Sequence, residues 1–396
     1  MGRREATRFG ESTAHAPDID LWASGSGVQT PYLAVHLRQL EANLDRAAAI
    51  ARSHNLGLRP HIKTHKCIEI ARMQLGCGAI GVTASKPQEA LVFIEAGIPS
   101  VTVAYPIVVP SSARALLESA ARRKCDLRFV VDSLNSVDAI VSAVGGVSRA
   151  SMLLEIDVGL ERCGVKPETK AVEQIARAIC SSPKLSFKGI LSHAGHAYAA
   201  PGKREIVAIA ANELRQMRHV VDRLAAQNIA VEEVSVGSTP TVLAAESFAG
   251  VTEIRPGNYV FLDSTACRLG IANISDVSLG IVTTVVSINE RYCIVDAGSK
   301  VLSSDTGPHG TGGGGFGTCF ALGSAATSWA DGRQVARLSE EHGFVEHGGE
   351  PIPIGARAVV FPNHSCPAVN LADRLVVLEQ GRDPDFWAVA ARGKTT

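Results

Sequence analysis

The chain has 396 residues, 46% of them hydrophobic, and its 39 lysines and arginines balance its 39 aspartates and glutamates. That length is enough for two domains or for one barrel with an addition, and the net charge of zero gives no bulk field that would recruit nucleic acid or an anionic membrane. The apolar runs are too short to span a bilayer, no signal peptide is visible, and the nine cysteines lack Cys-x-x-Cys spacing. These features predict a cytoplasmic protein with reduced thiols and with neither a membrane nor a nucleic acid as partner.

Residues from about 31 to 265 alternate short β-rich runs with amphipathic helical segments. The predicted strands are Leu58–Lys63, Ala79–Ala84, Ser100–Tyr105, Leu127–Asp132, Met152–Asp157, Phe187–His193, Val231–Gly237 and Glu253–Tyr259. Helical patterns include Leu37–Arg52, Pro87–Ala96, Ala113–Arg123, Thr169–Ser181 and Arg204–Gln227. Eight such repeats predict a (β/α)8 TIM-like barrel. A doubly wound open sheet is the alternative, but no Gly-x-Gly-x-x-Gly motif opens its first helix.

After about residue 270 the pattern changes to short strands without a long helix. Leu279–Asn289 and Arg291–Asp296 are predicted to pair, and Ala336–Leu338, Ala356–Phe361 and Leu375–Glu379 are further strands. The segment Gly310–Gly317 lacks the Lys-Ser/Thr and the helix of a phosphate loop, so it predicts a flexible lid or linker. We therefore expect a barrel over residues 31–268, a smaller, mainly β domain over 269–396, and an N-terminal extension, residues 1–30, associated with the β domain.

The first predicted barrel strand ends in a cluster of cations, with Lys63, His65 and Lys66 close together. Such crowding lowers the pKa of a lysine, and a neutral amine is a nucleophile toward carbonyls. A solvated basic loop is the alternative interpretation. The place of the cluster at the carboxyl end of a barrel strand, where chemistry gathers in such folds, favours the chemical one.

Two other strand ends predict a grip on a phosphate group. Gly237-Ser238-Thr239 follows the seventh strand and offers backbone N–H groups and two hydroxyls, and Gly257-Asn258-Tyr259 follows the eighth. Each fragment alone is also an ordinary helix start. A lysine opposite a two-loop phosphate grip is more specific, because it describes a site for pyridoxal phosphate held as a Schiff base.

His364 and Cys366 are candidate metal ligands in the C-terminal domain. Residues i and i+2 of a strand face the same side, and imidazole with thiolate favours zinc. A buried cysteine beside a turn histidine is the alternative, since two ligands do not complete a site. His342 and His347 are weaker candidates, with a surface loop as the favoured interpretation.

Together these motifs resemble the fold-type III pyridoxal-phosphate enzymes, which have an alanine-racemase-like barrel and a β domain, and within them the eukaryotic-type D-serine dehydratase and D-threonine aldolase group. The resemblance runs from about Thr30 to Gly393. It implies that Lys63 carries the cofactor, that Arg162 partners the phenolic oxygen of the cofactor, and that the two loops bind its phosphate. It also implies a divalent metal on His364 and Cys366, zinc before manganese or cobalt, and a homodimer.

Within the group, several details resemble the dehydratases. The chain has His364-Ser365-Cys366 where aldolases carry His-x-Asp, and Gly195-His196-Ala197-Tyr198 is similar to the dehydratase Gly-x-x-Tyr, which places Tyr198 among the cofactor-binding residues. Ala199 stands where aldolases carry a histidine. The resemblance therefore implies that D-serine, D-threonine or 3-hydroxy-D-aspartate is converted to a 2-oxo acid and ammonia.

In the expected mechanism Lys63 removes the α-proton and the metal makes the β-hydroxyl a leaving group. The alternative is an aldolase, in which His193 or His65 would deprotonate the β-hydroxyl and the products would be glycine and an aldehyde. A racemase is less favoured, because Tyr292 is the only tyrosine after residue 270. A non-catalytic cofactor carrier is a further alternative, but it would leave the metal pair without a purpose.

Overall fold

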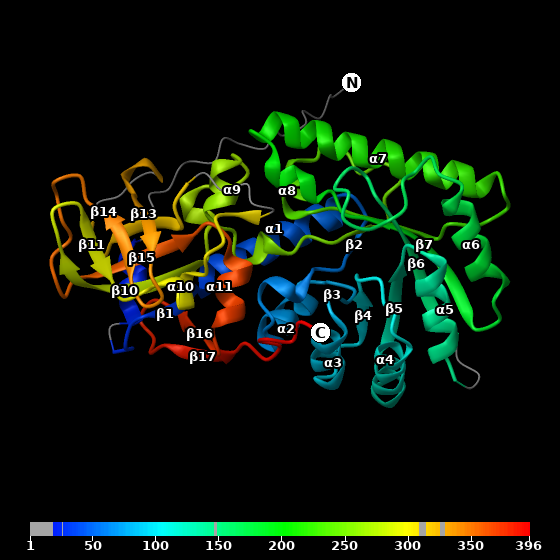
Figure 1. The fold of residues 1–396 in the computed structure, drawn as a ribbon, viewed down its shortest axis with the longest axis horizontal. Helices are drawn as coiled ribbons and strands as arrows, with labels where there is room; N and C mark the ends of the chain where they lie inside the picture. The colour runs from blue at the N-terminus through cyan, green and yellow to red at the C-terminus, as the bar shows by residue number, and fades with distance from the viewer. Residues whose placement is uncertain (1–18, 26, 146–148, 309–313, 325–328) are drawn as a thin grey trace, which may run out of the picture.

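The computed structural model describes residues 19–25, 27–145, 149–308, 314–324 and 329–396. Two bodies lie side by side, a β/α barrel and a smaller β-rich unit, with helix α11 (Ser365–Leu371) of the second body close to the first (Figure 1). Within these ranges no helix combines the length and the apolar character that crossing a membrane requires.

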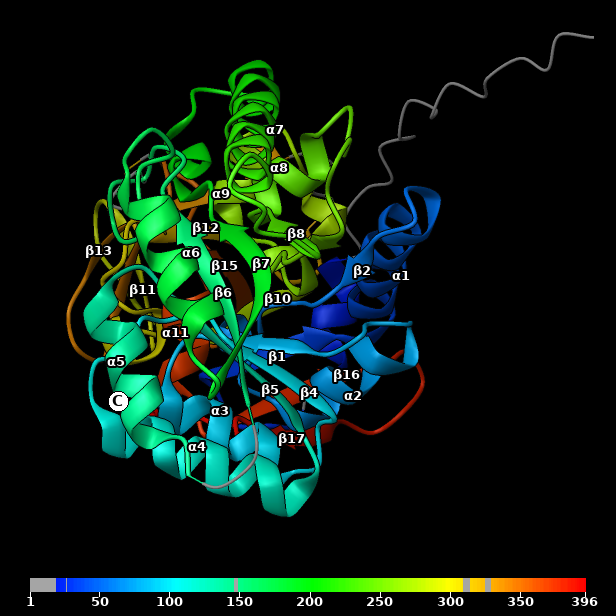
Figure 2. The ribbon, with the colours of Figure 1, turned by 90° about the vertical axis from the view of Figure 1, so that its right-hand side faces the viewer.

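The barrel wall consists of eight parallel strands in the order β2-β9-β8-β7-β6-β5-β4-β3. They are β2 (Gly57–Leu58), β3 (Val82–Ala84), β4 (Ser100–Val103), β5 (Asp126–Val131), β6 (Ala150–Ile156), β7 (Leu185–Ser192), β8 (Glu233–Val236) and β9 (Glu253–Ile254). A parallel bridge from His61, beyond β2, to Thr83 of β3 joins the two ends of this order. The prediction of a TIM-like barrel is confirmed, and Figure 2 shows its helices outside the strands.

Two predicted strands end earlier than expected, after β2 and after β9. The ring of His61 accepts a hydrogen bond from the backbone N–H of Lys63 at 3.5 Å and begins the 3₁₀ helix η2 (Ile62–Thr64). After β9 the chain forms the 3₁₀ helix η4 (Asn258–Val260). The candidate residues Lys63 and Asn258 therefore lie on tight turns at the mouth of the barrel rather than within strands.

Amphipathic helices pack their apolar faces against the barrel wall. The α-helices of the first body are α1 (Leu37–Ser53), α2 (Ile68–Gly76), α3 (Pro87–Glu95), α4 (Pro110–Arg123), α5 (Leu134–Ala143), α6 (Ala171–Ser181), α7 (Lys203–Ala225), α8 (Thr239–Ala244) and α9 (Ser264–Arg268). Further 3₁₀ helices are η1 (Ile19–Gly25), η3 (Gly195–Ala199), η5 (Ile274–Asp276) and η7 (Trp329–Asp331). The five predicted helical segments correspond to α1, α3, α4, α6 and α7, with ends that differ by a few residues.

The second body is a nine-stranded sheet in the order β11-β14-β13-β12-β15-β10-β1-β16-β17, and an additional pairing of β10 with β11 closes part of it into a ring. Its strands are β1 (Tyr32–His36), β10 (Leu279–Ile288), β11 (Tyr292–Val295), β12 (Gly317–Ala321), β13 (Arg333–Leu338), β14 (Gly343–Glu346), β15 (Arg357–Pro362), β16 (Arg374–Leu378) and β17 (Asp385–Ala388). Besides α11, the described residues hold only one short α-helix here, α10 (Ser299–Leu302). Of the predicted loop Gly310–Gly317, residues 310–313 lie outside the described ranges.

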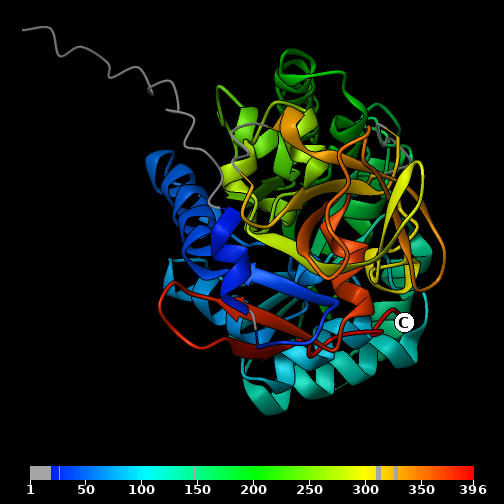
Figure 3. The same cartoon turned by 90° about the vertical axis from the view of Figure 1, so that its left-hand side faces the viewer.

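Strand β1 corrects one expectation, because it belongs to the second sheet although the sequence analysis placed its residues in the barrel segment. It pairs antiparallel with β10 and parallel with β16. Figure 3 shows this blue strand between strands drawn in yellow and red. Pairing partners more than 240 residues away along the chain leave no local signal, so this placement could not be predicted. The division of the chain at residues 30 and 268 otherwise stays a prediction.

Candidate active site

Lys63 is half-buried at the mouth of the barrel, on the turn η2. Burial lowers the pKa of its ammonium group, and the charges of Arg162 and Arg255 lower it further, against Cys366 and Glu89, which raise it. The lowered pKa agrees with the sequence-based expectation, but its largest cause is burial rather than the neighbouring residues of the cationic motif.

The second lysine of the motif, Lys66, has a structural role. Its Nζ atom forms a buried ion pair with Glu89 Oε1 at 3.2 Å and donates a hydrogen bond to the carbonyl oxygen of Ala391 at 3.3 Å. The backbone N–H of Ala391 donates in turn to the carbonyl oxygen of Lys66 at 3.1 Å. Lys66 thus ties the lysine turn to helix α3 and to the C-terminal segment, which leaves Lys63 as the lysine available for chemistry.

Two histidines flank Lys63. Burial, followed by the positive charges of Lys63, Arg162 and Arg255, lowers the pKa of His193 well below its usual value, and the same kinds of cause lower the pKa of His61. These causes favour the neutral form of both rings. His193 is a predicted site residue that the structure brings to Lys63. His61 was not predicted, although it stands only two residues before the lysine.

His65 lies apart from this group. Its ring is fully buried and accepts a hydrogen bond from the backbone N–H of Cys67 at 3.1 Å. It packs edge-on against the ring of Phe93, with the two ring centroids 6.4 Å apart. Burial lowers the pKa of His65 to about 3. Since the ring packs into the wall of the barrel, the geometry gives no support to His65 as a catalytic base.

Arg162 is held at the mouth by the loop that follows β6. The carboxylate of Asp157 accepts hydrogen bonds from the N–H groups of Gly159 and Glu161, both at 3.0 Å, and so shapes the loop. One guanidinium nitrogen of Arg162 lies 4.0 Å from the buried carboxylate of Glu155. The charge of Arg162 also acts on Lys63, so the structure brings these two predicted residues together.

Arg255 is a further cation under the site that the sequence analysis did not single out. It is buried, its Nε atom donates to Ser235 Oγ at 2.8 Å, and its Nη2 atom donates to the carbonyl oxygen of Ser192. Its charge acts on both Lys63 and His193. Its place directly after β9 is the signal that could have identified it, since that end of a barrel strand faces the site.

The two predicted phosphate loops form one unit through Thr239. Its hydroxyl accepts hydrogen bonds from the backbone N–H groups of Gly257 at 3.2 Å and Tyr259 at 3.1 Å, and the side chain of Tyr198 also hydrogen-bonds to Thr239. A Cβ atom at Gly257 would lie 3.1 Å from the Cβ atom of His61, so glycine permits this close approach to the lysine turn. Four predicted positions thus converge beside the segment that carries Lys63.

Two side chains in these loops are engaged by other parts of the protein. The hydroxyl of Tyr259 is buried and accepts a hydrogen bond from Gln74 Nε2 at 3.1 Å. The amide of Asn258 donates to Asp263 and accepts from Ser365. Neither side chain is therefore placed to serve a phosphate group, and the backbone N–H of Tyr259 is already donated to Thr239.

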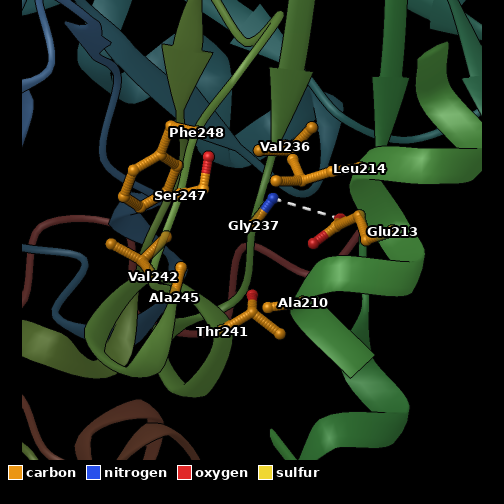
Figure 4. Close-up of a pocket in the computed structure, with 10 residues that line it drawn as sticks. All are labelled: Ala210, Glu213, Leu214, Val236, Gly237, Thr241, Val242, Ala245, Ser247 and Phe248. Carbon is orange, nitrogen blue, oxygen red and sulfur yellow. Dashed lines mark hydrogen bonds between the residues drawn. The ribbon is translucent and has the colours of Figure 1, made fainter. Parts of the chain in front are cut away.

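A buried carboxylate braces the phosphate loop from behind. Figure 4 shows Glu213 of helix α7 facing Gly237 across a cavity of about 10 Å³. Its Oε1 atom accepts hydrogen bonds from the N–H of Gly237 at 3.3 Å and from Ser192 Oγ at 2.7 Å. Because Ser192 directly precedes His193, Glu213 supports the phosphate loop and the histidine at once. The cavity itself is too small for a cofactor.

His364 and Cys366 lie close together, but not on a strand as the sequence analysis assumed. Strand β15 ends at Pro362, His364 is the N-cap of α11, and Cys366 is in the first turn of that helix. His364 Nδ1 lies 2.9 Å from Asp305 Oδ2, and the imidazole also hydrogen-bonds to the Cys366 thiol. Cys366 Sγ lies 3.3 Å from Thr64 Oγ1, next to Lys63 in sequence.

His364 and Cys366 each favour the charged form of the other. Burial opposes both charges, yet the charge of Cys366 and the hydrogen bond to Asp305 raise the pKa of His364 to about 10. The charge of His364 likewise holds the pKa of Cys366 below its usual value, against the effect of burial. In the part of the chain that the structure describes, no group of three or more His, Cys, Asp or Glu side chains forms a complete metal site. His342 is exposed, and the ring of half-buried His347 contacts the carbonyl oxygen of Asn289 at 3.0 Å.

Family models match both bodies of the chain. Residues 35–265 match the alanine racemase N-terminal domain, and residues 278–378 match a putative serine dehydratase domain. The chain belongs to the alanine racemase N-terminal domain family. This membership confirms the family predicted from sequence and supports pyridoxal phosphate as the cofactor.

Relatives in this family extend over nearly the whole chain. This chain is 31% identical to D-threonine aldolase of Arthrobacter, over 92% of this chain and 93% of that protein. It is 30% identical to D-threo-3-hydroxyaspartate dehydratase of Delftia, over 86% of this chain and 91% of that protein. The solved structure of the Delftia dehydratase superposes with a TM-score of 0.84 and 29% identity, covering 91% of this chain and 97% of that one.

Two solved variants of a D-threo-3-hydroxyaspartate dehydratase have substitutions at a histidine and a cysteine. In one a histidine is replaced by alanine, and in another a cysteine two positions later is replaced, the latter in a metal-free form. His364 and Cys366 of this chain have the same order and spacing.

Proposed function

We propose that this protein is a pyridoxal-phosphate-dependent lyase that removes the β-hydroxyl and the amino group of a 3-hydroxy D-amino acid, yielding a 2-oxo acid and ammonia. The observation that carries the proposal is that candidate cofactor-binding residues and a candidate metal ligand both lie next to the turn that carries Lys63. Arg162, His193 and the linked phosphate loops approach Lys63 from the barrel. Cys366 approaches it from the second body through its contact with Thr64.

The residues present fit the cofactor. Lys63 has a lowered pKa, as a lysine that attacks an aldehyde requires, and a cation, Arg162, stands beside it. The glycine at position 257 leaves the space next to His61 that a side chain would fill. When bound, pyridoxal phosphate would supply an electron sink for the charge released at Cα.

The protein's own groups then move the protons. Lys63, released from the cofactor when substrate takes its place, would accept the α-proton on Nζ. Arg162 and Arg255 favour the neutral form of Lys63 that this step requires. Among the neighbouring groups, His193 is a neutral imidazole that could exchange a proton at the substrate oxygen.

We also propose that His364 and Cys366 hold a divalent metal, with zinc favoured over manganese or cobalt by the thiolate. The two side chains are in contact, and Asp305 binds one nitrogen of the imidazole, as a carboxylate does for many histidine ligands. The metal would supply a Lewis acid for the leaving hydroxyl. Substrate or water would complete its coordination.

Retro-aldol cleavage to glycine and an aldehyde is the second candidate, and the position of His193 is the observation that favours it. A neutral base beside Lys63 could remove the proton of the β-hydroxyl. Relatives of nearly equal identity bear both kinds of name. Cys366 follows His364 with the same spacing as the substituted histidine and cysteine of a D-threo-3-hydroxyaspartate dehydratase, which supports the dehydratase.

A small-molecule substrate and a cytoplasmic homodimer complete the proposal. The side chains of Tyr105, Val108 and Val109 are exposed beyond the end of β4, at the barrel mouth, with 40%, 59% and 52% of their surface accessible. Three exposed apolar side chains in one loop support contact with a second copy.

The proposal predicts a defined substrate panel. Ammonia should be released from D-serine, D-threonine or 3-hydroxy-D-aspartate, and none from L-serine or D-alanine, because the reaction needs both the D-configuration and a β-hydroxyl. The measurement is a coupled ammonia assay with chiral analysis of the remaining amino acid. Conversion of D-alanine to L-alanine would identify a racemase instead, and no reaction with any of the three substrates would favour a carrier.

A further inference from the structure

A buried hydrogen-bonded cluster, formed by Asn258, Asp263 and Ser365, joins the phosphate loop to helix α11. Asp263 is fully buried, and its Oδ2 atom accepts hydrogen bonds from Asn258 Nδ2 at 2.7 Å and from the N–H of Ser365 at 3.1 Å. Ser365 Oγ donates to Asn258 Oδ1 at 2.5 Å. Each of the three residues therefore contacts the other two.

Each end of the cluster is continuous with one half of the site. On the barrel side, Asn258 lies between Gly257 and Tyr259, whose N–H groups are both held by the hydroxyl of Thr239. On the other side, Ser365 lies between His364 and Cys366 in sequence, at the start of α11. The hydrogen bonds of the cluster and the backbone on either side of it thus connect the phosphate loops to the metal pair, and Asn258, Asp263 and Ser365 are all buried.

We propose that Asn258, Asp263 and Ser365 are positioning residues that couple the two halves of the site, so that binding of the cofactor phosphate and binding of the metal strengthen each other. This inference rests on the proposed function, which supplies the two ligands. Ordering of η4 by a phosphate group would order the first turn of α11 through Ser365, so the metal would bind a site that is already arranged. The strengthening must be reciprocal, because it is a coupling free energy.

The experiment measures zinc affinity of the full chain by competition with a chromophoric chelator, without cofactor, with pyridoxal phosphate and with pyridoxal. Pyridoxal can still react with Lys63 but carries no phosphate, so it separates the proposed route from the direct contact of Cys366 with the lysine turn. We expect pyridoxal phosphate to tighten zinc binding about tenfold, within the usual range of such couplings, and pyridoxal to have little effect.

Two variants each remove hydrogen bonds of the cluster, and a third variant serves as a matched control. Ser365→Ala and Asp263→Asn should each still bind zinc and pyridoxal phosphate. In both variants, however, pyridoxal phosphate should increase the zinc affinity by less than about twofold instead of about tenfold, which is well below typical couplings. Ser264→Ala should keep the full factor, because Ser264 donates only to the carbonyl oxygen of Phe361, at 3.0 Å, beside the cluster. Circular dichroism and thermal unfolding establish that each variant is folded.

Three results would overturn the inference. They are an equal zinc affinity with and without pyridoxal phosphate, an equal effect of pyridoxal, and an undiminished factor in both Ser365→Ala and Asp263→Asn. Failure of the proposed function is distinct, because the zinc affinity would then be the same in Cys366→Ser as in the native protein.

Discussion

Replacing Lys63 by alanine should abolish turnover together with the yellow, borohydride-reducible link between protein and cofactor. Lys63 is the lysine beside Arg162 and His193, and its lowered pKa suits both attack on the cofactor aldehyde and removal of the α-proton. Loss of the proton transfer alone should lower kcat by roughly 10²- to 10⁴-fold. Absorption spectra report the yellow colour, mass-spectrometric mapping after reduction locates the link to the cofactor, and initial rates measure turnover.

Lys66→Met is the matched control for that experiment. It removes a lysine three residues away that is committed to Glu89 and Ala391. Breaking this buried ion pair should lower the free energy of unfolding by about 3–5 kcal/mol, while the folded protein retains the reducible link. A Lys63→Ala protein that keeps the yellow adduct and turns over substrate would refute the assignment of Lys63.

Loss of the metal pair should have the second-largest effect. His364→Ala and Cys366→Ser should bind zinc far more weakly and lose kcat by roughly 10²- to 10⁴-fold, since a Lewis acid contributes several kcal/mol to the transition state. A chelator should produce the same loss in the native protein, and added zinc should restore it. Metal analysis and initial rates with a 3-hydroxy D-amino acid provide the measurement.

Asp305 offers a graded control, because it contacts His364 and is not one of the proposed metal ligands. Asp305→Asn should weaken zinc binding by only about 10- to 100-fold, as is typical when the partner of a ligand histidine is lost. Full activity after exhaustive chelation, or in Cys366→Ser, would contradict the role of the metal and would mean that the lyase reaction proceeds without it.

The sequence predicted main-chain positions better than side-chain directions. Strand periodicity located the ends of the barrel strands, and those ends meet at one mouth in any closed parallel barrel, so Lys63 and the two phosphate loops could be placed together. The same reasoning could not show that the side chain of Tyr259 turns toward Gln74, or that His65 packs against Phe93. Those directions depend on packing partners from other parts of the chain.

Contacts between residues far apart in the sequence were also not predicted. Asn258 and Ser365, which lie in different bodies, are 107 positions apart, and within the second body His364 contacts Asp305 across 59 positions. Nothing in local pattern connects such positions, and the helix that begins at Ser365 replaced an assumed strand. Arg255 was overlooked because the predicted strand continued through it to Tyr259, whereas β9 ends at Ile254 and leaves Arg255 directly after the strand, where its charge acts on Lys63.

Product analysis with D-threonine tests the central claim most directly. The cofactor- and zinc-loaded protein should convert D-threonine to equal amounts of 2-oxobutanoate and ammonia, with no glycine. Both products can be quantified in one reaction by chromatography and an ammonia assay. Glycine and acetaldehyde in equal amounts would contradict the dehydratase and would mean that the same lysine, histidine and metal pair carry out an aldol cleavage.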